Sequence, residues 1–301
     1  MRVLFVFVDG VGLGPDDAHT NAMVEGMPRL NSLLGTAPVL SAAPYVSTRA
    51  TLVALDATLG VAGLPQSGTG QAVVLTGEDA IRMHGRHFGP WVPTRLRPLV
   101  REQSVLARAQ SAGRRVAFAN AYPEEVLAPA AEGRRTPPFL RAGPPLAALG
   151  AGVLTRHTAD LERGVAVASE IVNDGWRERL HRSSVPHIDE VRAAQNLASI
   201  ARAHDLTLFA HYTTDYAGHL RDLAAATTAI ARVDAFLGAL IDCMPNDMRL
   251  IVASDHGNIE DCTAGHTRNP AFCLVAGPGH AGCARGMKDL RDVAGVVLGE
   301  D

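Results

Sequence analysis

Short, mostly apolar runs recur along the chain. Residues 3–8 are continuously apolar and rich in Val and Phe, and they lead directly into Asp9 and Gly10. A run of this kind is typical of a strand that is buried on both faces of a parallel sheet. The pattern returns at 206–212, 249–253 and 271–276, each time followed by polar residues or glycine. We therefore expect at least four strands in one sheet.

Helical spacing of apolar residues occurs between these runs. The Ala-rich segment 220–243 places apolar side chains at intervals of three or four residues. Shorter helices are expected at 28–34, where Pro28 suits the first turn, and at 189–203 and 287–298. Alternating strands and helices indicate an α/β fold with a central, mostly parallel sheet flanked by helices.

Two N-terminal segments carry weaker patterns. We expect a short strand at 39–42 and a helix at 47–55 that is capped by Ser47.

The middle of the chain is different. Residues 81–186 are rich in Pro, Gly and Arg, with helices expected at 103–112 and 161–174 and a strand at 115–119. We interpret this segment as a small cap domain. It is inserted into an α/β core formed by 1–80 and 187–301.

Composition narrows the class of protein. The 301 residues are 47% hydrophobic and 20% charged, which excludes global disorder. A formal net charge of −3 argues against a general binder of nucleic acid or of anionic membranes. None of the four cysteines forms a CxxC pair. Residues 3–8 are too short to span a bilayer, and because they end at Asp9 without a small-residue cleavage site, we do not expect a signal peptide. We expect a cytoplasmic protein and leave its oligomeric state open.

Carboxylates and imidazoles gather at the predicted strand ends. The six candidates are Asp9, Asp215, His219, Asp255, His256 and His266. Since ligands of open α/β sheets bind at the carboxyl ends of strands, we expect these side chains to converge. Their donor atoms suit Mn²⁺ or Zn²⁺, and two such ions about 4 Å apart clamp the oxygens of a phosphoryl group.

Four short motifs connect the chain to a known family. In chain order they are Phe7-Val8-Asp9-Gly10, Asp215-Tyr-Ala-Gly-His219, Ser254-Asp255-His256-Gly257-Asn258 and Gly265-His266-Thr267. The ordered set resembles the metal motifs of the alkaline phosphatase superfamily, in the branch of cofactor-independent phosphoglycerate mutase and phosphopentomutase. The resemblance implies an alkaline-phosphatase-like core with two divalent metal ions. One ion would be held by Asp215, His219 and His266, and the other by Asp9, Asp255 and His256.

The resemblance also implies a Ser or Thr nucleophile in a Gly-containing loop that opens a helix. Residues 63–71 supply Ser67 and Thr69, and we favour Thr69 because Thr69-Gly70 resembles the phosphopentomutase motif. Gln71 stands where that motif has His, and the Asn-Ser-Glu motif of phosphoglycerate mutase is absent.

The function that follows is metal-dependent phosphoryl transfer from a small phosphorylated metabolite through a phospho-threonine intermediate. We favour a phosphatase or phosphodiesterase, because the cap is short and matches neither mutase cap. The alternatives are a phosphomutase of the phosphoglycerate or phosphopentose type and a non-catalytic, metal-stabilised binding protein. His84, Arg268 and unspecified cap arginines are candidates for substrate binding.

Overall fold

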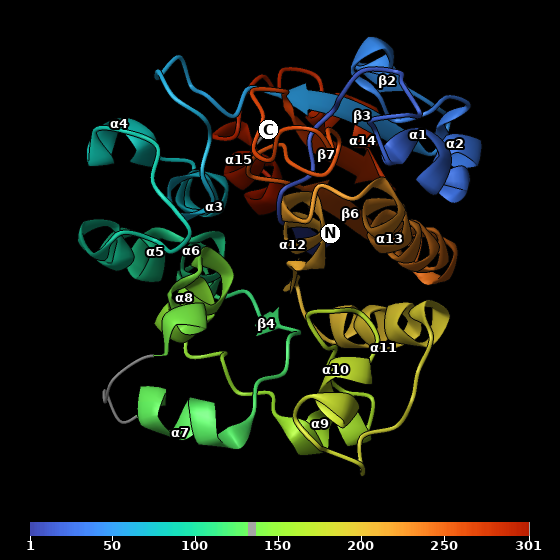
Figure 1. The fold of residues 1–301 in the computed structure, drawn as a ribbon. Helices are drawn as coiled ribbons and strands as arrows, with labels where there is room; N and C mark the ends of the chain where they lie inside the picture. The colour runs from blue at the N-terminus through green and yellow to red at the C-terminus, as the bar shows by residue number, and fades with distance from the viewer. Residues whose placement is uncertain (132–136, 301) are drawn as a thin grey trace.

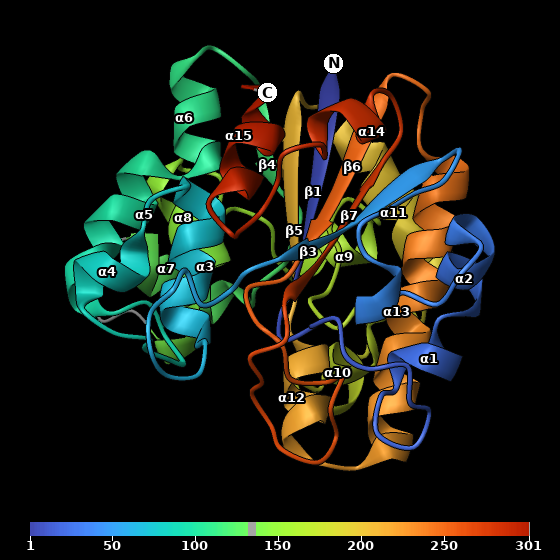
Figure 2. The same cartoon turned by 90° about the horizontal axis from the view of Figure 1, so that it is seen from above.

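A computed structural model describes residues 1–131 and 137–300. Seven strands of this part form one sheet, in the order β2-β3-β7-β6-β1-β5-β4, with helices on both faces (Figures 1 and 2). The strands are β1 (Arg2–Val8), β2 (Tyr45–Val46), β3 (Ala50–Leu55), β4 (Val116–Phe118), β5 (Leu206–His211), β6 (Met248–Ala253) and β7 (Ala271–Ala276). The predicted α/β class is confirmed.

The sheet is mixed. Strand β1 pairs in parallel with β5 and β6, and β4 pairs in parallel with β5. Strand β7 is antiparallel to β6 and β3, and β2 is antiparallel to β3. The prediction of a mostly parallel sheet therefore holds only for the half that contains β6, β1, β5 and β4.

Helices cover both faces of the sheet. One face carries α1 (Met23–Gly26), α2 (Pro28–Leu34), α11 (Glu190–Arg202) and α13 (Leu223–Cys243). The other carries α3 (Ser67–Thr76), α4 (Ala80–His84), α5 (Arg97–Gln103), α6 (Val105–Ser111), α8 (Gly143–Gly150) and α15 (Asp292–Leu298). The remaining helices are α7 (Glu124–Ala131), α9 (Thr158–Glu162), α10 (Asp174–Glu178), α12 (Thr213–His219) and α14 (His280–Cys283), with 3₁₀ turns at Leu40–Ala42, Thr94–Leu96 and Pro138–Arg141.

Strand β1 lies between two hydrophobic cores. Leu4 and Val6 pack into the core beneath α13, whereas Phe5 and Phe7 pack into the core beneath α3. This alternation explains why the first run is apolar at every position. Helix α13 is long and apolar enough to cross a membrane, but 61% of its most apolar window is buried inside the structure, as in a core helix.

Three predicted elements are wrong. Residues 40–42 form a 3₁₀ turn instead of a strand, and residues 50–55 form β3 instead of a helix. Ser47 closes the turn before β3, because its hydroxyl accepts from the Ala50 amide at 3.1 Å, and the Thr and Val residues that follow favour a strand. The expected helix at 161–174 is interrupted after Glu162, and a helix resumes only at Asp174.

Part of the segment predicted as a cap belongs to the main sheet. Strand β4 is its edge strand and pairs with β5. Helices α5, α6 and α8 contribute to the same hydrophobic core as α3. The division into a core and an inserted cap stays a prediction.

Buried His211 makes stability depend on pH. Its Nδ1 is 2.7 Å from the Ser169 carbonyl oxygen, and burial lowers the pKa of His211 from 6.5 to about 4. Because the unfolded chain binds a proton that the folded chain excludes, this contribution to stability is present above about pH 6.5 and is lost as the pH falls towards 4.

We predict that lowering the pH from about 7.5 to about 4.5 reduces the free energy of unfolding of the wild type by about 2 kcal/mol more than that of His211→Gln. Denaturant unfolding at each pH measures this difference. The exposed control, His19→Gln, is expected to follow the wild type. Parallel curves for the His211→Gln and wild-type proteins would contradict the assignment.

Candidate metal centre

The carboxyl ends of three adjacent parallel strands deliver the predicted metal donors. Asp9 directly follows β1, Asp255 and His256 follow β6, and Asp215 lies in the first turn of α12 after β5. Since β1 lies between β5 and β6 in the sheet, these strand ends are neighbours. The fold therefore brings distant parts of the sequence to one edge.

One group of donors is fully buried. It comprises Asp9, Asp255 and His256, whose ligand atoms all lie within 4.8 Å of one another. His256 Nε2 is 3.4 Å from Asp9 Oδ1 and 3.7 Å from Asp255 Oδ2. This is the trio expected from the resemblance.

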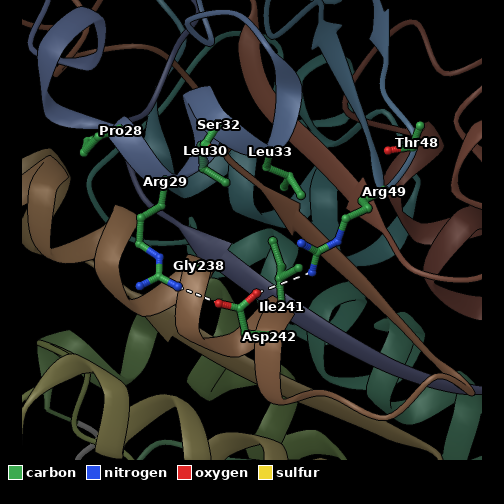
Figure 3. Close-up of a pocket in the computed structure, with 10 residues that line it drawn as sticks. All are labelled: Pro28, Arg29, Leu30, Ser32, Leu33, Thr48, Arg49, Gly238, Ile241 and Asp242. Carbon is green, nitrogen blue, oxygen red and sulfur yellow. Dashed lines mark hydrogen bonds and ion pairs between the residues drawn. The ribbon is translucent and has the colours of Figure 1, made fainter.

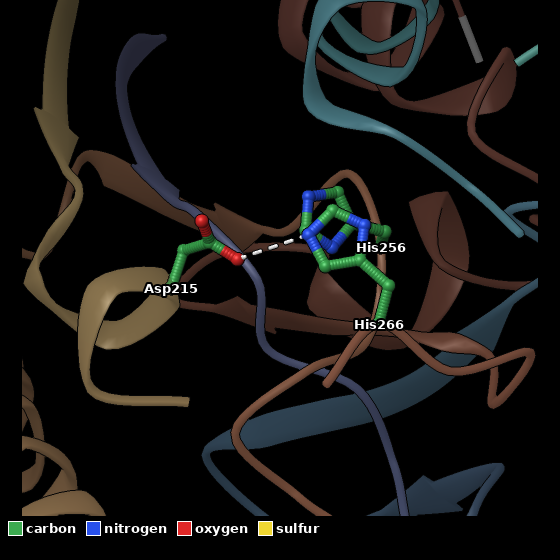
Figure 4. Close-up of side chains that lie close together, drawn as sticks. All are labelled: Asp215, His256 and His266. Carbon is green, nitrogen blue, oxygen red and sulfur yellow. Dashed lines mark ion pairs between the residues drawn. The ribbon is translucent and has the colours of Figure 1, made fainter. Parts of the chain in front are cut away.

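A second group adjoins the first and shares His256. It comprises Asp215, His256 and His266, again within 4.8 Å, and Figure 4 shows the Asp215 carboxylate facing the two imidazoles. His266 Nε2 is 3.5 Å from Asp215 Oδ1. His219 Nε2 lies 3.3 Å from Asp215 Oδ2 and 3.2 Å from His266 Nε2. All six predicted donors thus converge, with His256 between the two expected trios.

Hydrogen bonds hold these donors in orientation. His266 Nδ1 is 2.9 Å from the Pro65 carbonyl oxygen, which leaves Nε2 facing Asp215. The side-chain amide of Asn258 donates from Nδ2 to Asp215 Oδ1 at 2.7 Å. Outer partners of this kind fix the tautomer and orientation of metal ligands.

Gln71 orients Asp9 in the same way, through a hydrogen bond. Its Nε2 donates to Asp9 Oδ2 at 3.1 Å, and its Oε1 accepts from the Gly143 amide at 2.8 Å. Gln71 therefore links the metal centre to the start of α8. The sequence marked this residue only as a departure from the phosphopentomutase motif.

A buried glutamate organises the loop that carries the ligands. The Glu260 carboxylate accepts hydrogen bonds from the backbone N–H groups of Gly12 and Asn258 at 2.9 and 2.7 Å. It also accepts one from the Thr267 hydroxyl at 2.5 Å. A Cβ at Gly12 would lie 2.5 Å from this carboxyl group, so a side chain there would break the contact. Glu260 was not among the predicted site residues, and its only signal in the sequence is its place two residues after the Ser254–Asn258 motif.

The loop after β1 needs glycine for a second reason. Gly10 has φ +68°, and a Cβ there would lie 2.5 Å from Asp215 Oδ1. Glycine therefore permits the close approach of Asp9 and Asp215.

The electrostatics of the site fit a divalent cation. Burial raises the pKa of Asp9 well above its ordinary value, and Asp255 raises it further. Burial likewise raises the pKa of Asp255. Burial opposes protonation of His256, yet Asp255 and Asp9 together raise its pKa to about 10. Asp9 Oδ1 and Asp255 Oδ2 are buried and have no hydrogen-bond partner among the described residues.

Two adjacent buried carboxylates are costly unless positive charge offsets them. The pKa of Asp215 shifts in the opposite direction. Burial would raise its pKa, but hydrogen bonding to His266 and the charge of His256 lower it to about 2. The donor set consists of carboxylate oxygens and imidazole nitrogens, which are the ligands of Zn²⁺ and similar metals. These residues therefore fit the metal that the family resemblance implies.

Ser67, rather than Thr69, faces the metal donors. Ser67 is the first residue of α3, and its Oγ is 3.0 Å from His256 Nε2. The Thr69 hydroxyl is fully buried and donates to the carbonyl oxygens of Gln66 at 3.3 Å and Phe88 at 3.4 Å. It also accepts from the Phe88 amide at 3.1 Å. The geometry thus reverses the preference for Thr69 that the sequence suggested.

Two cavities meet at Ser67. A cavity of about 430 Å³ is lined by Ser67, Asp9, Gln71 and aromatic side chains. A cavity of about 370 Å³ is lined by Ser67, Asp215, His219, His266 and Arg221. The buried Ser67 therefore borders two cavities, which also contact Asp9, Asp215, His219 and His266.

The candidate substrate residues lie outside the lining of these two cavities. The His84 ring packs against Phe88 with centroids 4.9 Å apart, and Arg268 Nε donates to the Gly63 carbonyl oxygen at 3.1 Å. None of the described cap arginines lines either cavity; they include Arg95, Arg97, Arg101, Arg114, Arg115 and Arg141. Arg134 and Arg135 lie outside the described residues.

A larger cavity, of about 470 Å³, lies between α2 and α13 (Figure 3). There Arg29 Nη2 and Arg49 Nη2 lie 2.6 and 3.4 Å from the two carboxylate oxygens of Asp242. None of the predicted site residues lines this cavity. Its charged groups pair with one another, so the chemistry is assigned to the metal centre.

Comparison with known sequences finds relatives of the C-terminal part. A sequence model of the Metalloenzyme superfamily matches residues 182–300. The 2,3-bisphosphoglycerate-independent phosphoglycerate mutase of Desulforudis audaxviator is 34% identical over 110 residues, which are 34% of this chain and 21% of that protein. The mutase of the same name from Campylobacter jejuni strain RM1221 is 30% identical over 168 residues, 48% of this chain and 33% of that protein. The chain thus matches no more than about a third of the length of these relatives.

Solved structures resemble the whole fold. The cold-active alkaline phosphatase of a psychrophilic Shewanella species has a TM-score of 0.54 at 11% identity, over 100% of this chain and 99% of that one. The alkaline phosphatase of the Antarctic bacterium TAB5 has a TM-score of 0.51 at 12% identity, over 99% and 97%. These identities show the fold alone. Residues 182–300 therefore resemble the Metalloenzyme superfamily and cofactor-independent phosphoglycerate mutases, and the whole chain has an alkaline-phosphatase-like fold in which the candidate metal donors converge.

Proposed function

We propose that this protein is a metal-dependent phosphatase that transfers the phosphoryl group of a small phosphate ester first to Ser67 and then to water. The observation that carries the proposal is the position of the Ser67 hydroxyl, 3.0 Å from His256 Nε2 and at the meeting point of two cavities. The superfamily match and the alkaline phosphatase fold support it.

The metal donors and Ser67 have different roles in the proposed reaction. Two divalent ions, Mn²⁺ or Zn²⁺, held by the six donors would polarise the phosphoryl oxygens and favour the ionised hydroxyl of the nucleophile. Ser67 Oγ attacks phosphorus, the bond from phosphorus to the ester oxygen breaks, and the alcohol leaves with a proton. Water then cleaves the phosphoserine and releases phosphate. Since Ser67 begins α3, the positive end of the helix dipole favours the anionic group that it carries.

Solvent access favours transfer to water. The His219 side chain is 54% exposed, and the cavity beside it reaches Ser67. A mutase has to exclude water while its phosphorylated intermediate exists. An accessible phosphoserine is therefore expected to hydrolyse.

A phosphomutase is the second candidate. It is favoured by the names of the relatives that match the C-terminal part. Phosphate release and substrate isomerisation distinguish the two functions, because only a phosphatase produces free phosphate in step with loss of the ester.

Substitution of the two hydroxyl residues tests the proposal. With Mn²⁺ or Zn²⁺ and a panel of phosphate monoesters, we expect phosphate release by the wild type and a loss of at least about 10³-fold in Ser67→Ala, as for removal of a nucleophile. Thr69→Val lacks only the buried hydroxyl, so we expect it to retain most activity. Mass spectrometry of acid-quenched enzyme is expected to find phosphate on Ser67.

Other outcomes would contradict this account. Isomerisation without phosphate release would favour the mutase, and phosphate on Thr69 would restore the choice made from the sequence. Metal binding without turnover of any ester would favour the binding protein.

Gln71 offers a test of how Asp9 is held. In Gln71→Ala we expect metal affinity to fall by about 10- to 100-fold, because Asp9 loses a hydrogen-bond donor. Titration calorimetry with Mn²⁺ measures the affinity, and thermal unfolding of the metal-free protein checks that the variant folds. Gln103→Ala, at an exposed position on α5, is the control. Equal affinities in the two variants would show that Gln71 does not support the metal centre.

A further inference from the structure

One wall of the cavity of about 430 Å³ beside Ser67 is aromatic. Its lining comes from separate parts of the chain and includes Trp91, Tyr122, Phe139, Tyr212 and Tyr216. Aromatic residues are only 5% of the whole sequence, so their concentration here is a local feature of the molecule. The metal donors Asp9 and Asp215 lie in the same lining.

Two of the rings on this wall are stacked on one another. Tyr122 and Phe139 are parallel to within 2°, with centroids 6.1 Å apart, and Phe118 continues the row behind Tyr122. Phe139 is 42% exposed and Tyr216 is 68% exposed. Large aromatic side chains with free surface in a concave site bind apolar or planar groups.

The charges in this lining point to the same kind of ligand. Among the described residues, it contains no lysine or arginine; its carboxylates and imidazole are those of Asp9, Asp215 and His219, which belong to the metal centre. A substrate with a second anionic group, such as a carboxylate, would lie here without a cation. The described arginine near Ser67, Arg221, lines the other cavity, on the side of His219 and His266.

From this arrangement we infer that the substrate is a phosphate monoester whose alcohol carries a flat, uncharged ring, and that the ring binds against Phe139 and Tyr122. The inference rests on the proposed phosphatase function and specifies its substrate class. The phosphoryl group lies at Ser67 and the metal donors, and the ring lies in the aromatic cavity. Phe139 is a specificity residue in this scheme.

Matched esters test the ring directly. 2-Phenylethyl phosphate and ethyl phosphate are both esters of primary alcohols, so their difference reports mainly on the ring. We expect kcat/KM to be at least about tenfold higher for the phenyl ester, because burial of a ring contributes more than the 1.4 kcal/mol that a factor of ten requires. 2-Cyclohexylethyl phosphate has a saturated ring and is expected to fall between them. Equal values for the phenyl and ethyl esters would overturn the inference, as would equal values for the phenyl and cyclohexyl esters.

A variant pair assigns the effect to the aromatic wall. In Phe139→Ala, the preference for the phenyl ester over the ethyl ester is expected to drop to about threefold or less, since one stacking partner is lost. The control is Tyr45→Ala, which removes a similarly exposed aromatic side chain on β2, away from both cavities. An unchanged preference in Phe139→Ala would exclude this wall as the ring site.

Binding separates failure of this inference from failure of the proposed function. In Trp176→Phe, Trp91 is the remaining tryptophan of the two in the chain. With Mn²⁺ present, 2-phenylethylphosphonate is expected to change Trp91 fluorescence with an affinity at least about tenfold higher than that of ethylphosphonate. This preference supports the ring site even if no ester is turned over, in which case only the phosphatase function fails. Turnover of ethyl phosphate without any such preference would overturn the ring site alone.

Discussion

The structure depends on placing two buried carboxylates, Asp9 and Asp255, next to each other at the ends of adjacent parallel strands. Each is destabilised by burial and by the charge of nearby carboxylates, which raises both pKa values. His256 lies between them, and its positive charge offsets part of their negative charge, although burial opposes its protonation. Oxygen atoms on both carboxylates have no hydrogen-bond partner among the described residues. An arrangement of this kind is stable when a cation completes it, so the fold and the chemistry depend on the same charges.

Hydrogen bonds from surrounding polar residues hold these carboxylates and their loops in position. Glu260 ties the loop after β1 to the loop after β6, and Gln71 ties Asp9 to the first helix residue of α8. Helix α8 belongs to the segment 81–186, which also supplies Trp91, Tyr122 and Phe139 to the aromatic wall. Under the proposal, the ring site and the support of Asp9 therefore share one part of the fold.

Much of the site was predictable from the sequence, because each ligand motif immediately follows an apolar run and strand ends meet at one sheet edge. The choice between Ser67 and Thr69 was not predictable in this way. Ser67 and Thr69 are two residues apart on one helix, and only the direction of each hydroxyl separates them. The strand at 50–55 was misread as a helix because Ser47 resembles a helix cap, and local pattern does not show that β7 pairs beside it. Buried partners such as Glu260 act through long-range contacts that no short motif records.

The central claim is that six donors hold a pair of metal ions beside Ser67. Anomalous diffraction from crystals of the Mn²⁺-loaded protein, recorded near the manganese edge, measures this most directly. The account predicts two peaks, one bounded by Asp9, Asp255 and His256 and the other by Asp215, His219 and His266, both next to the Ser67 hydroxyl. Manganese peaks elsewhere in the molecule with none among these side chains would contradict it.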